Sequence, residues 1–294
     1  MDVARTSLLD IAYVTAGPIT GPPVILLHGW PDSASTWDGV TPALATAGHR
    51  VIVPFLRGFG PTRFLDAGTM RSGQLAALGH DLIEFIDALA LNHVALVGHD
   101  WGARAAAIAT TELQASGRVT RLALLSVGYG TNDPSQALPL RQVHNYWYHW
   151  YMALPRGETL IRDDRRTFTR YIWDAWGAPG WRLDDAAFDE LARAFENPDW
   201  ADVTLNSYRH RWGLADGDAR YQALDARLNP APQVSIPTLV LHGADDRCND
   251  PMTSAGKERF FSGRYERALL PGVGHFPQRE DPAATTRALL DWLR

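Results

Sequence analysis

The stretch LVGHDWGARAA, Leu96 to Ala106, joins a run of strand-forming residues to a run of helix formers and places Asp100 at the junction. Gly98 and Gly102 lie two residues before and two residues after this aspartate. On a sharp strand-to-helix turn, side chains at those two positions would collide, and glycine removes the collision. Such a turn lifts the central side chain above the sheet. Capping of the helix by Asp100 is the simpler interpretation, but capping requires no pair of glycines.

Short apolar runs recur along most of the chain around this turn. Five of them have the length and composition of buried strands: 24–29, 50–55, 94–100, 122–127 and 238–243. The segment 75–91 has apolar residues at the i, i+3 and i+4 spacing of one buried helix face. Strands that alternate with helices predict an α/β fold, with a mostly parallel sheet flanked by helices.

The alternation stops after Val127 and resumes near Pro237. The residues between are rich in Trp, Tyr, Arg and Asp, and include helical stretches such as 184–196. We therefore expect a helical cap over residues 128–232, inserted after the sixth strand of a core formed by residues 1–127 and 233–294. Such a cap would cover the C-terminal edge of the sheet, where open α/β folds bind their ligands.

Composition excludes several classes of function. The 294 residues carry a formal net charge of −5, which predicts no nucleic-acid partner. The Arg-rich segment 162–170 also contains aspartates, and we interpret it as a solvated helix face. Cys248 is the single cysteine, which excludes an internal disulfide, and no Cys/His set has the spacing of a metal site. Without a signal peptide or an 18-residue apolar run, we expect a soluble, cytoplasmic protein with no membrane partner. A homodimer is compatible with the sequence, which specifies no oligomeric state.

Two further segments supply partners for Asp100. The segment LVLHGADDRCNDP ends a predicted strand with Asp245 and Asp246, and LLPGVGHFPQRE places His275 after another strand. Asp100, one of the two aspartates and His275 follow one another in the order nucleophile, acid, base. The turn around Asp100 is then a nucleophile elbow with aspartate in place of the usual serine.

Backbone groups near Asp100 predict an oxyanion hole. The segment LLHGWPDS follows an early strand, and its Trp30 N–H could pair with the N–H of Trp101 to hold a developing negative charge.

The segments HGWPDS, GHDWGA, HGADD and GHFP together resemble the motifs of the α/β-hydrolase fold family, over nearly the whole chain. The aspartate nucleophile is similar to that of its epoxide hydrolase and haloalkane or haloacid dehalogenase branches. The resemblance implies that Asp246, three residues after Gly243, is the acid, with Asp245 as the alternative, and it places His28 among the substrate-binding residues. Phe55 departs from the family, which usually has an acidic residue at this position outside the reacting groups.

An aspartate carboxylate is suited to attack a saturated carbon, which would give an alkyl ester of Asp100. His275 would then activate water against the ester, with the Trp30 and Trp101 amides holding the oxyanion. For an epoxide substrate the product is a vicinal diol. Water is the second substrate, so no cofactor is expected.

The leaving group separates the two branches. An opening epoxide develops alkoxide charge and needs a proton donor, which a phenol with a pKa of about 10 can supply. Tyr148, seven residues before Pro155, and Tyr208 are similar to the two lid tyrosines of epoxide hydrolases. The alternative for each is a tyrosine of the core or of an interface.

A haloacid dehalogenase is the competing hypothesis. The segment YHWYM resembles the His-Trp pair that holds halide in fluoroacetate dehalogenases, which would make His149 and Trp150 substrate-binding residues, and Arg104 matches the arginine that clamps the substrate carboxylate there. Against it, Tyr148 takes the lid position, Trp101 replaces a second arginine, and residues 127–130 lack the expected carboxylate. We favour epoxide hydrolysis. A hydrolase-like ligand receptor without turnover ranks third, because all triad members are present.

Overall fold

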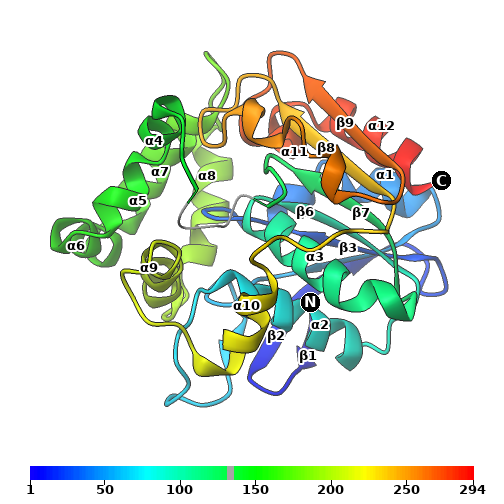
Figure 1. The fold of residues 1–294 in the computed structure, drawn as a ribbon, viewed down its shortest axis with the longest axis horizontal. Helices are drawn as coiled ribbons and strands as arrows, with labels where there is room; N and C mark the ends of the chain where they lie inside the picture. The colour runs from blue at the N-terminus through cyan, green and yellow to red at the C-terminus, as the bar shows by residue number, and fades with distance from the viewer. Residues whose placement is uncertain (131–135) are drawn as a thin grey trace.

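The computed structural model describes residues 1–130 and 136–294 (Figure 1). Within these residues a nine-stranded sheet has the order β1-β2-β4-β3-β6-β7-β8-β9, with β5 paired to β2. Pairings that involve β1, β2 and β5 are antiparallel and all others are parallel. The strands are β1 (Asp2–Arg5), β2 (Leu9–Ala16), β3 (Pro23–Leu27), β4 (Arg50–Pro54), β5 (Arg63–Phe64), β6 (Val94–His99), β7 (Val119–Leu125), β8 (Thr238–Gly243) and β9 (Tyr265–Leu270).

The predicted mostly parallel α/β sheet is confirmed. The five predicted strands correspond to β3, β4, β6, β7 and β8. The prediction that the cap follows the sixth strand is off by one in chain order, because the two-residue strand β5 adds to the count and the helical insertion follows β7. A strand of two residues carries no periodicity that a sequence reading can detect.

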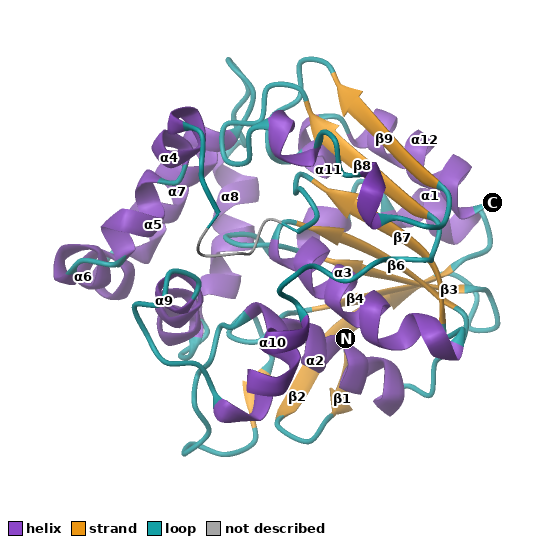
Figure 2. Cartoon of the chain, viewed as in Figure 1, coloured by secondary structure: helices purple, strands orange, loops and turns teal. Residues whose placement is uncertain are grey.

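Helices cover both faces of the sheet (Figure 2). One face packs on α1 (Thr41–Thr46) and α12 (Pro282–Leu293), and the other on α2 (Leu75–Ala88) and α3 (Trp101–Leu113). Along β3 the buried side chains alternate between the two apolar clusters, as the two-residue period of a strand requires. The predicted apolar face of α2 is confirmed, because it lies in one cluster with the inner face of the sheet. The short helix α11 (Pro277–Glu280) precedes α12.

The helices between β7 and β8 are α4 (Leu140–Asn145), α5 (Trp147–Met152), α6 (Pro155–Asp163), α7 (Arg165–Trp176), α8 (Asp185–Ala192), α9 (Trp200–His210) and α10 (Gln222–Arg227). Helices α4 to α9 gather beside the C-terminal ends of the parallel strands, whereas α10 packs against α2 (Figure 1). The boundaries 128 and 232 of the cap stay a prediction, and residues 131–135 of this range lie outside the described residues.

The Arg-rich segment 162–170 forms ion pairs with neighbouring acidic residues, as expected for a solvated face. Arg162 pairs with Glu158 and Asp202, and Arg166 pairs with Asp189. Across residues 1–130 and 136–294, no helix combines the length and apolar character needed to cross a membrane.

Candidate active site

Asp100 occupies a sharp turn between β6 and α3. Its φ of 50° lies in the left-handed region, which is costly for a residue other than glycine. A Cβ on Gly98 would collide with the backbone of Gly102, and a Cβ on Gly102 would collide with the carbonyl of His28. The glycines therefore have the steric role that their spacing predicts. Within the described chain, the Asp100 side chain makes no capping hydrogen bond to α3, so the helix-cap interpretation has no support.

His275 and Asp246 meet Asp100 from two other loops. His275 Nδ1 lies 2.9 Å from Asp246 Oδ2, and His275 Nε2 lies 3.8 Å from Asp100 Oδ2. The structure separates the two candidate acids, because Asp246 is fully buried whereas Asp245 is exposed and belongs to the surface. The three side chains thus lie within the distances that the predicted triad of nucleophile, base and acid requires.

Hydrogen bonds and charges keep Asp246 ionised. Its Oδ1 accepts hydrogen bonds from the N–H groups of Cys248 (2.7 Å) and Asn249 (2.9 Å). Burial acts to raise the pKa of Asp246, but the positive charge and hydrogen bond of His275 outweigh it and hold the pKa well below its usual range. Burial likewise acts to lower the pKa of His275, and the Asp246 charge raises it above its usual value. A buried carboxylate can therefore stabilise an imidazolium here.

Sequence reasoning missed a second histidine on Asp246. His242 Nε2 lies 3.1 Å from Asp246 Oδ2 and 2.9 Å from the carbonyl oxygen of Asn249. Two imidazoles thus share one carboxylate oxygen. His242 lies within the apolar run of β8, where nothing in the sequence distinguishes it from a core residue.

The loop that carries His275 is fixed by Glu280, which sequence reasoning also missed. Glu280 Oε2 accepts hydrogen bonds from the N–H groups of Gly274 (2.7 Å) and Ala178 (2.9 Å), and Oε1 accepts one from Phe276 (2.9 Å). The N–H of His275 itself donates to the carbonyl of Trp176 in the cap (3.1 Å). One carboxylate therefore ties the base to the cap.

Replacing Glu280 with glutamine is expected to disturb both folding and catalysis. The amide NH₂ cannot accept from a backbone N–H, and a buried donor left unpaired costs about 1–3 kcal/mol of unfolding free energy. The Glu280 charge also contributes to raising the pKa of His275, so its removal should lower the pKa of the base and shift the acid limb of the pH–rate profile to lower pH. Denaturant titration and a pH profile measure the two effects.

The control is Glu266→Gln, which removes an exposed carboxylate paired with Arg264 and should change stability by no more than about 0.5 kcal/mol. A Glu280→Gln enzyme with an unshifted pH profile would show that Glu280 is only structural.

The predicted oxyanion hole lies beside the nucleophile. The N–H of Trp30 donates to Asp100 Oδ1 at 2.9 Å. Trp101 is the first residue of α3, and the first N–H groups of a helix have no intrahelical acceptor. The cap holds this loop in place, because Trp30 Nε1 donates to Thr204 Oγ1 of α9 (3.0 Å) and Trp173 Nε1 of α7 donates to the carbonyl of Pro31 (2.7 Å).

His28, which the resemblance places among the substrate-binding residues, contacts the backbone through both ring nitrogens, and a role in substrate binding stays a prediction. Its Nδ1 lies 2.9 Å from the carbonyl oxygen of Gly29, and its Nε2 accepts from the N–H of Leu56 at 3.1 Å. Burial lowers the pKa of His28 to about 4, so the ring stays neutral. Because both ring nitrogens contact the backbone, His28 connects the loop after β3 with the loop after β4.

Tyr148 on α5 and Tyr208 on α9 lie over the oxyanion loop. Their rings are 5.3 Å apart and perpendicular, and Tyr148 stacks on Trp30 at 5.7 Å while Tyr208 meets Trp30 edge-on at 5.0 Å. Both rings are buried. Burial raises the pKa of each phenol well above its usual value, and the negative charge of Asp100 adds to this, as the second-largest cause at Tyr208 and a lesser one at Tyr148. Both phenols therefore remain protonated and lie within the field of the nucleophile.

The side chain of Trp150 contacts neighbouring residues of the cap. Its indole Nε1 donates to the carbonyl of Val143 at 3.1 Å, and its ring packs on Trp212. The Trp150 N–H is thus already engaged by a backbone carbonyl, and the expectation that Trp150 binds substrate stays a prediction. His149 is buried, and its ring lies 4.6 Å from that of Tyr208.

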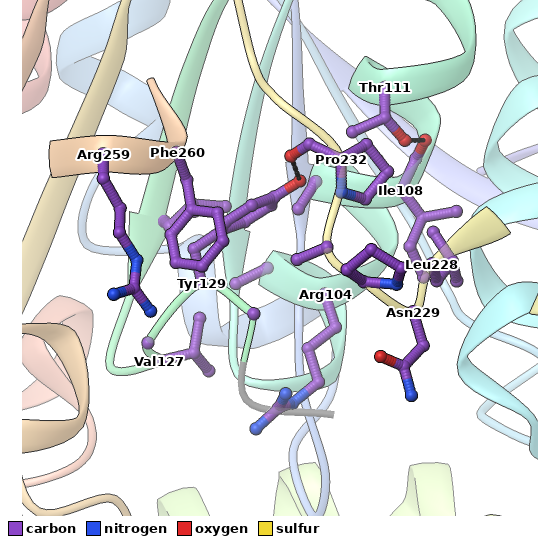
Figure 3. A pocket seen from close by; sticks show the side chains of 17 residues that line it. Arg104, Ile108, Thr111, Val127, Tyr129, Leu228, Asn229, Pro232, Arg259 and Phe260 are labelled. Atoms are coloured by element: carbon purple, nitrogen blue, oxygen red, sulfur yellow. Dashed lines mark hydrogen bonds between the residues drawn. The ribbon is translucent and has the colours of Figure 1, made fainter. Parts of the chain in front are cut away.

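Arg104 lies one turn after the nucleophile on α3 and is 6% exposed. Burial, and then the charge of Arg211, lowers its pKa. The side chain is among those that line a cavity of about 310 Å³, and Figure 3 shows Arg104 and Asn229 at the lower end of the residues drawn. The cavity walls are largely apolar, with Ile108 and Leu228 among them. Arg104 thus lines this cavity, and its role in substrate binding stays a prediction.

Comparison with known proteins identifies the family of the chain. Residues 22–282 match the family model described as alpha/beta hydrolase fold. The chain therefore belongs to the α/β-hydrolase fold family and is a hydrolase.

Its relatives place it in the epoxide hydrolase branch of that family. Epoxide hydrolase A of Mycobacterium tuberculosis is 29% identical over 313 residues, covering 98% of this chain and 95% of that protein. A crystal structure of a candidate epoxide hydrolase from Klebsiella pneumoniae subsp. pneumoniae MGH 78578 is 41% identical, with a TM-score of 0.92 over 99% of this chain and 96% of that one. A fluoroacetate dehalogenase from a Burkholderia species is 28% identical over 298 residues, covering 97% of this chain and 92% of that protein.

Proposed function

We propose that the protein hydrolyses an epoxide to a vicinal diol through an ester of Asp100. The observation that carries this proposal is the pair of buried, protonated phenols, Tyr148 and Tyr208, over the loop whose Trp30 amide contacts the nucleophile. A strained three-membered ring needs a carboxylate on one side and a proton donor on the other, and this site supplies both.

In the first half-reaction an oxygen of Asp100 attacks one epoxide carbon. The C–O bond of the ring breaks, and the alkoxide oxygen that leaves takes a proton from Tyr148 or Tyr208. The resulting ester joins the carboxylate oxygen of Asp100 to the former epoxide carbon. Burial strengthens the attraction between the phenols and the developing charge, because no bulk water screens it.

In the second half-reaction His275 removes a proton from a water molecule, which attacks the carbonyl carbon of the ester. The tetrahedral oxyanion is held by the N–H groups of Trp30 and Trp101, and the imidazolium of His275 is stabilised by Asp246. Collapse of this intermediate breaks the bond between the Asp100 carbonyl carbon and the alkoxy oxygen, which takes the proton of the added hydroxyl and leaves as the diol, and the Asp100 carboxylate is restored. The imidazolium of His275 returns its proton to the tyrosinate formed in the first half-reaction, through water, so that every residue regains its starting protonation state.

Haloacid dehalogenation is the second candidate, favoured by the similarity to a fluoroacetate dehalogenase and by Arg104 near the nucleophile. Two observations count against it. The Trp150 indole, the expected halide donor, is bonded to Val143, and a tryptophan stands at 101 where a second arginine was expected. A ligand receptor without turnover ranks below both, because the triad geometry is complete.

The experiment that tests the proposal compares two substrate panels. Purified protein is incubated with small aryl, aliphatic and terpenoid epoxides, and separately with 2-haloacids. We expect chromatography to detect diols from the epoxides, and ion chromatography to detect no halide from the haloacids. Halide release without diol formation would instead establish the dehalogenase.

A further inference from the structure

His149 presents a buried hydrogen-bond donor beside Tyr208. The indole Nε1–H of Trp212 donates to His149 Nδ1 at 3.0 Å, so Nδ1 carries the lone pair and the neutral ring carries its hydrogen on Nε2. His149 is 1% exposed, and its Nε2 has no hydrogen-bond partner among the described residues. Burial and the charges of Arg211 and Arg104 lower its pKa well below the usual value. A neutral donor is therefore buried without an acceptor from the described chain.

Arg211 presents further donors at the same tyrosine. It follows α9, and its guanidinium lies over the ring of Tyr208, 5.2 Å from the centroid. Its Nε and Nη2 atoms are shielded from solvent and have no hydrogen-bond partner among residues 1–130 and 136–294. Of the neighbouring charges, that of Arg211 lowers the pKa of His149 the most. His149 and Arg211 thus both contact Tyr208, and the unpaired polar atoms of both are hydrogen-bond donors.

We infer that the substrate of the proposed hydrolysis carries a carboxylate, bound by the Nε2–H of His149 and by the guanidinium of Arg211. This inference rests on the proposed function and names its substrate class as epoxy acids. Unpaired buried donors cost free energy until an acceptor satisfies them. A carboxylate offers two oxygens with lone pairs, matches the planar fork of arginine, and offsets the repulsion between Arg211 and Arg104.

The position of these donors also limits the length of the substrate. His149 and Arg211 both contact the ring of Tyr208, whose hydroxyl is a proposed donor to the epoxide oxygen. The carboxylate would therefore lie about one phenol ring away from the reacting carbon. Short epoxy acids, with few bonds between the ring and the carboxylate, fit this spacing better than long-chain ones.

A binding experiment tests the subsite without turnover. Asp100→Ala removes the nucleophile, and calorimetry then measures the affinity of this variant for butanoate and for butanamide, which differ in charge but not in carbon skeleton. We expect butanoate to bind about 10- to 100-fold more tightly, the range of one charge-assisted hydrogen bond. Adding Arg211→Gln or His149→Phe should remove most of this preference.

The matched control is Arg193→Gln, which removes an exposed positive charge from the same helical region and should leave the preference unchanged. If Arg193→Gln and Arg211→Gln reduce it equally, the effect is long-range attraction and the subsite does not exist. Circular dichroism of each variant establishes that it is folded.

A kinetic experiment separates this inference from the proposed function. The wild-type enzyme is given a short epoxy acid and its primary amide, and kcat/KM is compared. We expect the acid to be preferred about 10-fold or more, and Arg211→Gln to raise KM for the acid alone. Diol formation at equal kcat/KM from both compounds would overturn the carboxylate subsite and leave the epoxide hydrolase standing. Arg211-dependent binding of butanoate without any diol formation would support the carboxylate subsite and overturn the epoxide hydrolase.

Discussion

A His275→Gln enzyme is expected to consume one equivalent of epoxide and then stop, with the mass of the whole epoxide added to the peptide that contains Asp100. Alkylation uses the carboxylate and the phenols, whereas release of the ester needs a base for water. His275 Nε2 faces Asp100 and its Nδ1 is bound to Asp246, so glutamine removes the base without removing the nucleophile. Turnover should fall by roughly 10⁴-fold or more, as measured by diol formation and by mass spectrometry of the digested protein.

Isotope labelling sharpens this prediction. A single turnover of wild-type enzyme in H₂¹⁸O should place the label in the Asp100 carboxylate and not in the diol, because water attacks the carbonyl carbon of the ester. Direct attack of water on the epoxide would place the label in the diol.

Two variants serve as controls. Asp100→Ala should show neither adduct nor turnover. Asp246→Asn should slow hydrolysis of the ester more than its formation, because it weakens the orientation and charge of His275. Full activity in His275→Gln, or an adduct on another residue, would contradict the assignment of Asp100 as nucleophile.

The parts of the site that local sequence could predict are those fixed by local geometry. The elbow around Asp100 depends on glycines two residues away, because the steric conflict that they relieve is with the adjoining turn. His275 likewise directly follows a predicted strand. By contrast, the choice between Asp245 and Asp246 depends on which carboxylate is buried, and adjacent residues in a loop give no periodic signal for burial.

Other residues could not be predicted because their role arises only in three dimensions. Glu280 binds backbone groups on both sides of His275 and in the cap, and no sequence pattern links a carboxylate to distant N–H groups. Trp150 shows why a sequence resemblance does not fix the direction of a side chain. Its place in YHWYM resembles a halide-binding pair, but the direction of a helical side chain is set by packing, here on Trp212.

The edge of the sheet was missed for a related reason. The segment that forms β2 alternates buried and exposed residues only in part, so it lacks both the continuous apolar run of a central strand and the clear period of a half-buried one. The fold class was still predicted correctly because the parallel strands β3, β4, β6, β7 and β8 were detected.

The cap helices and the catalytic loops form one connected structure. The Trp30 indole donates a hydrogen bond to Thr204, and the Trp173 indole donates one to the carbonyl of Pro31. The N–H of His275 donates to the carbonyl of Trp176. These contacts between the cap and the catalytic loops therefore also fix the position of the two phenols relative to Asp100. We expect removal of the phenols to alter chemistry more than structure.

Replacing both Tyr148 and Tyr208 with phenylalanine should nearly abolish ring opening while the protein stays folded. Phenylalanine keeps the ring contacts with Trp30 and removes only the two hydroxyls, so the leaving alkoxide has no acid beside it. General acid catalysis contributes about 10²- to 10⁴-fold, and rapid-quench measurement of the covalent intermediate should show a loss of this size in the alkylation rate. Each single variant should lose less, because the other phenol remains.

Tyr171→Phe is the matched control, since Tyr171 lies on α7 and is 60% exposed; it should alkylate at the wild-type rate. A haloacid gives a second comparison, because a leaving halide needs no proton, and any dehalogenation should survive Tyr148→Phe/Tyr208→Phe far better than epoxide opening. If the double variant forms the ester at the wild-type rate, neither phenol is the acid. The epoxide assignment would then lose the observation on which it rests.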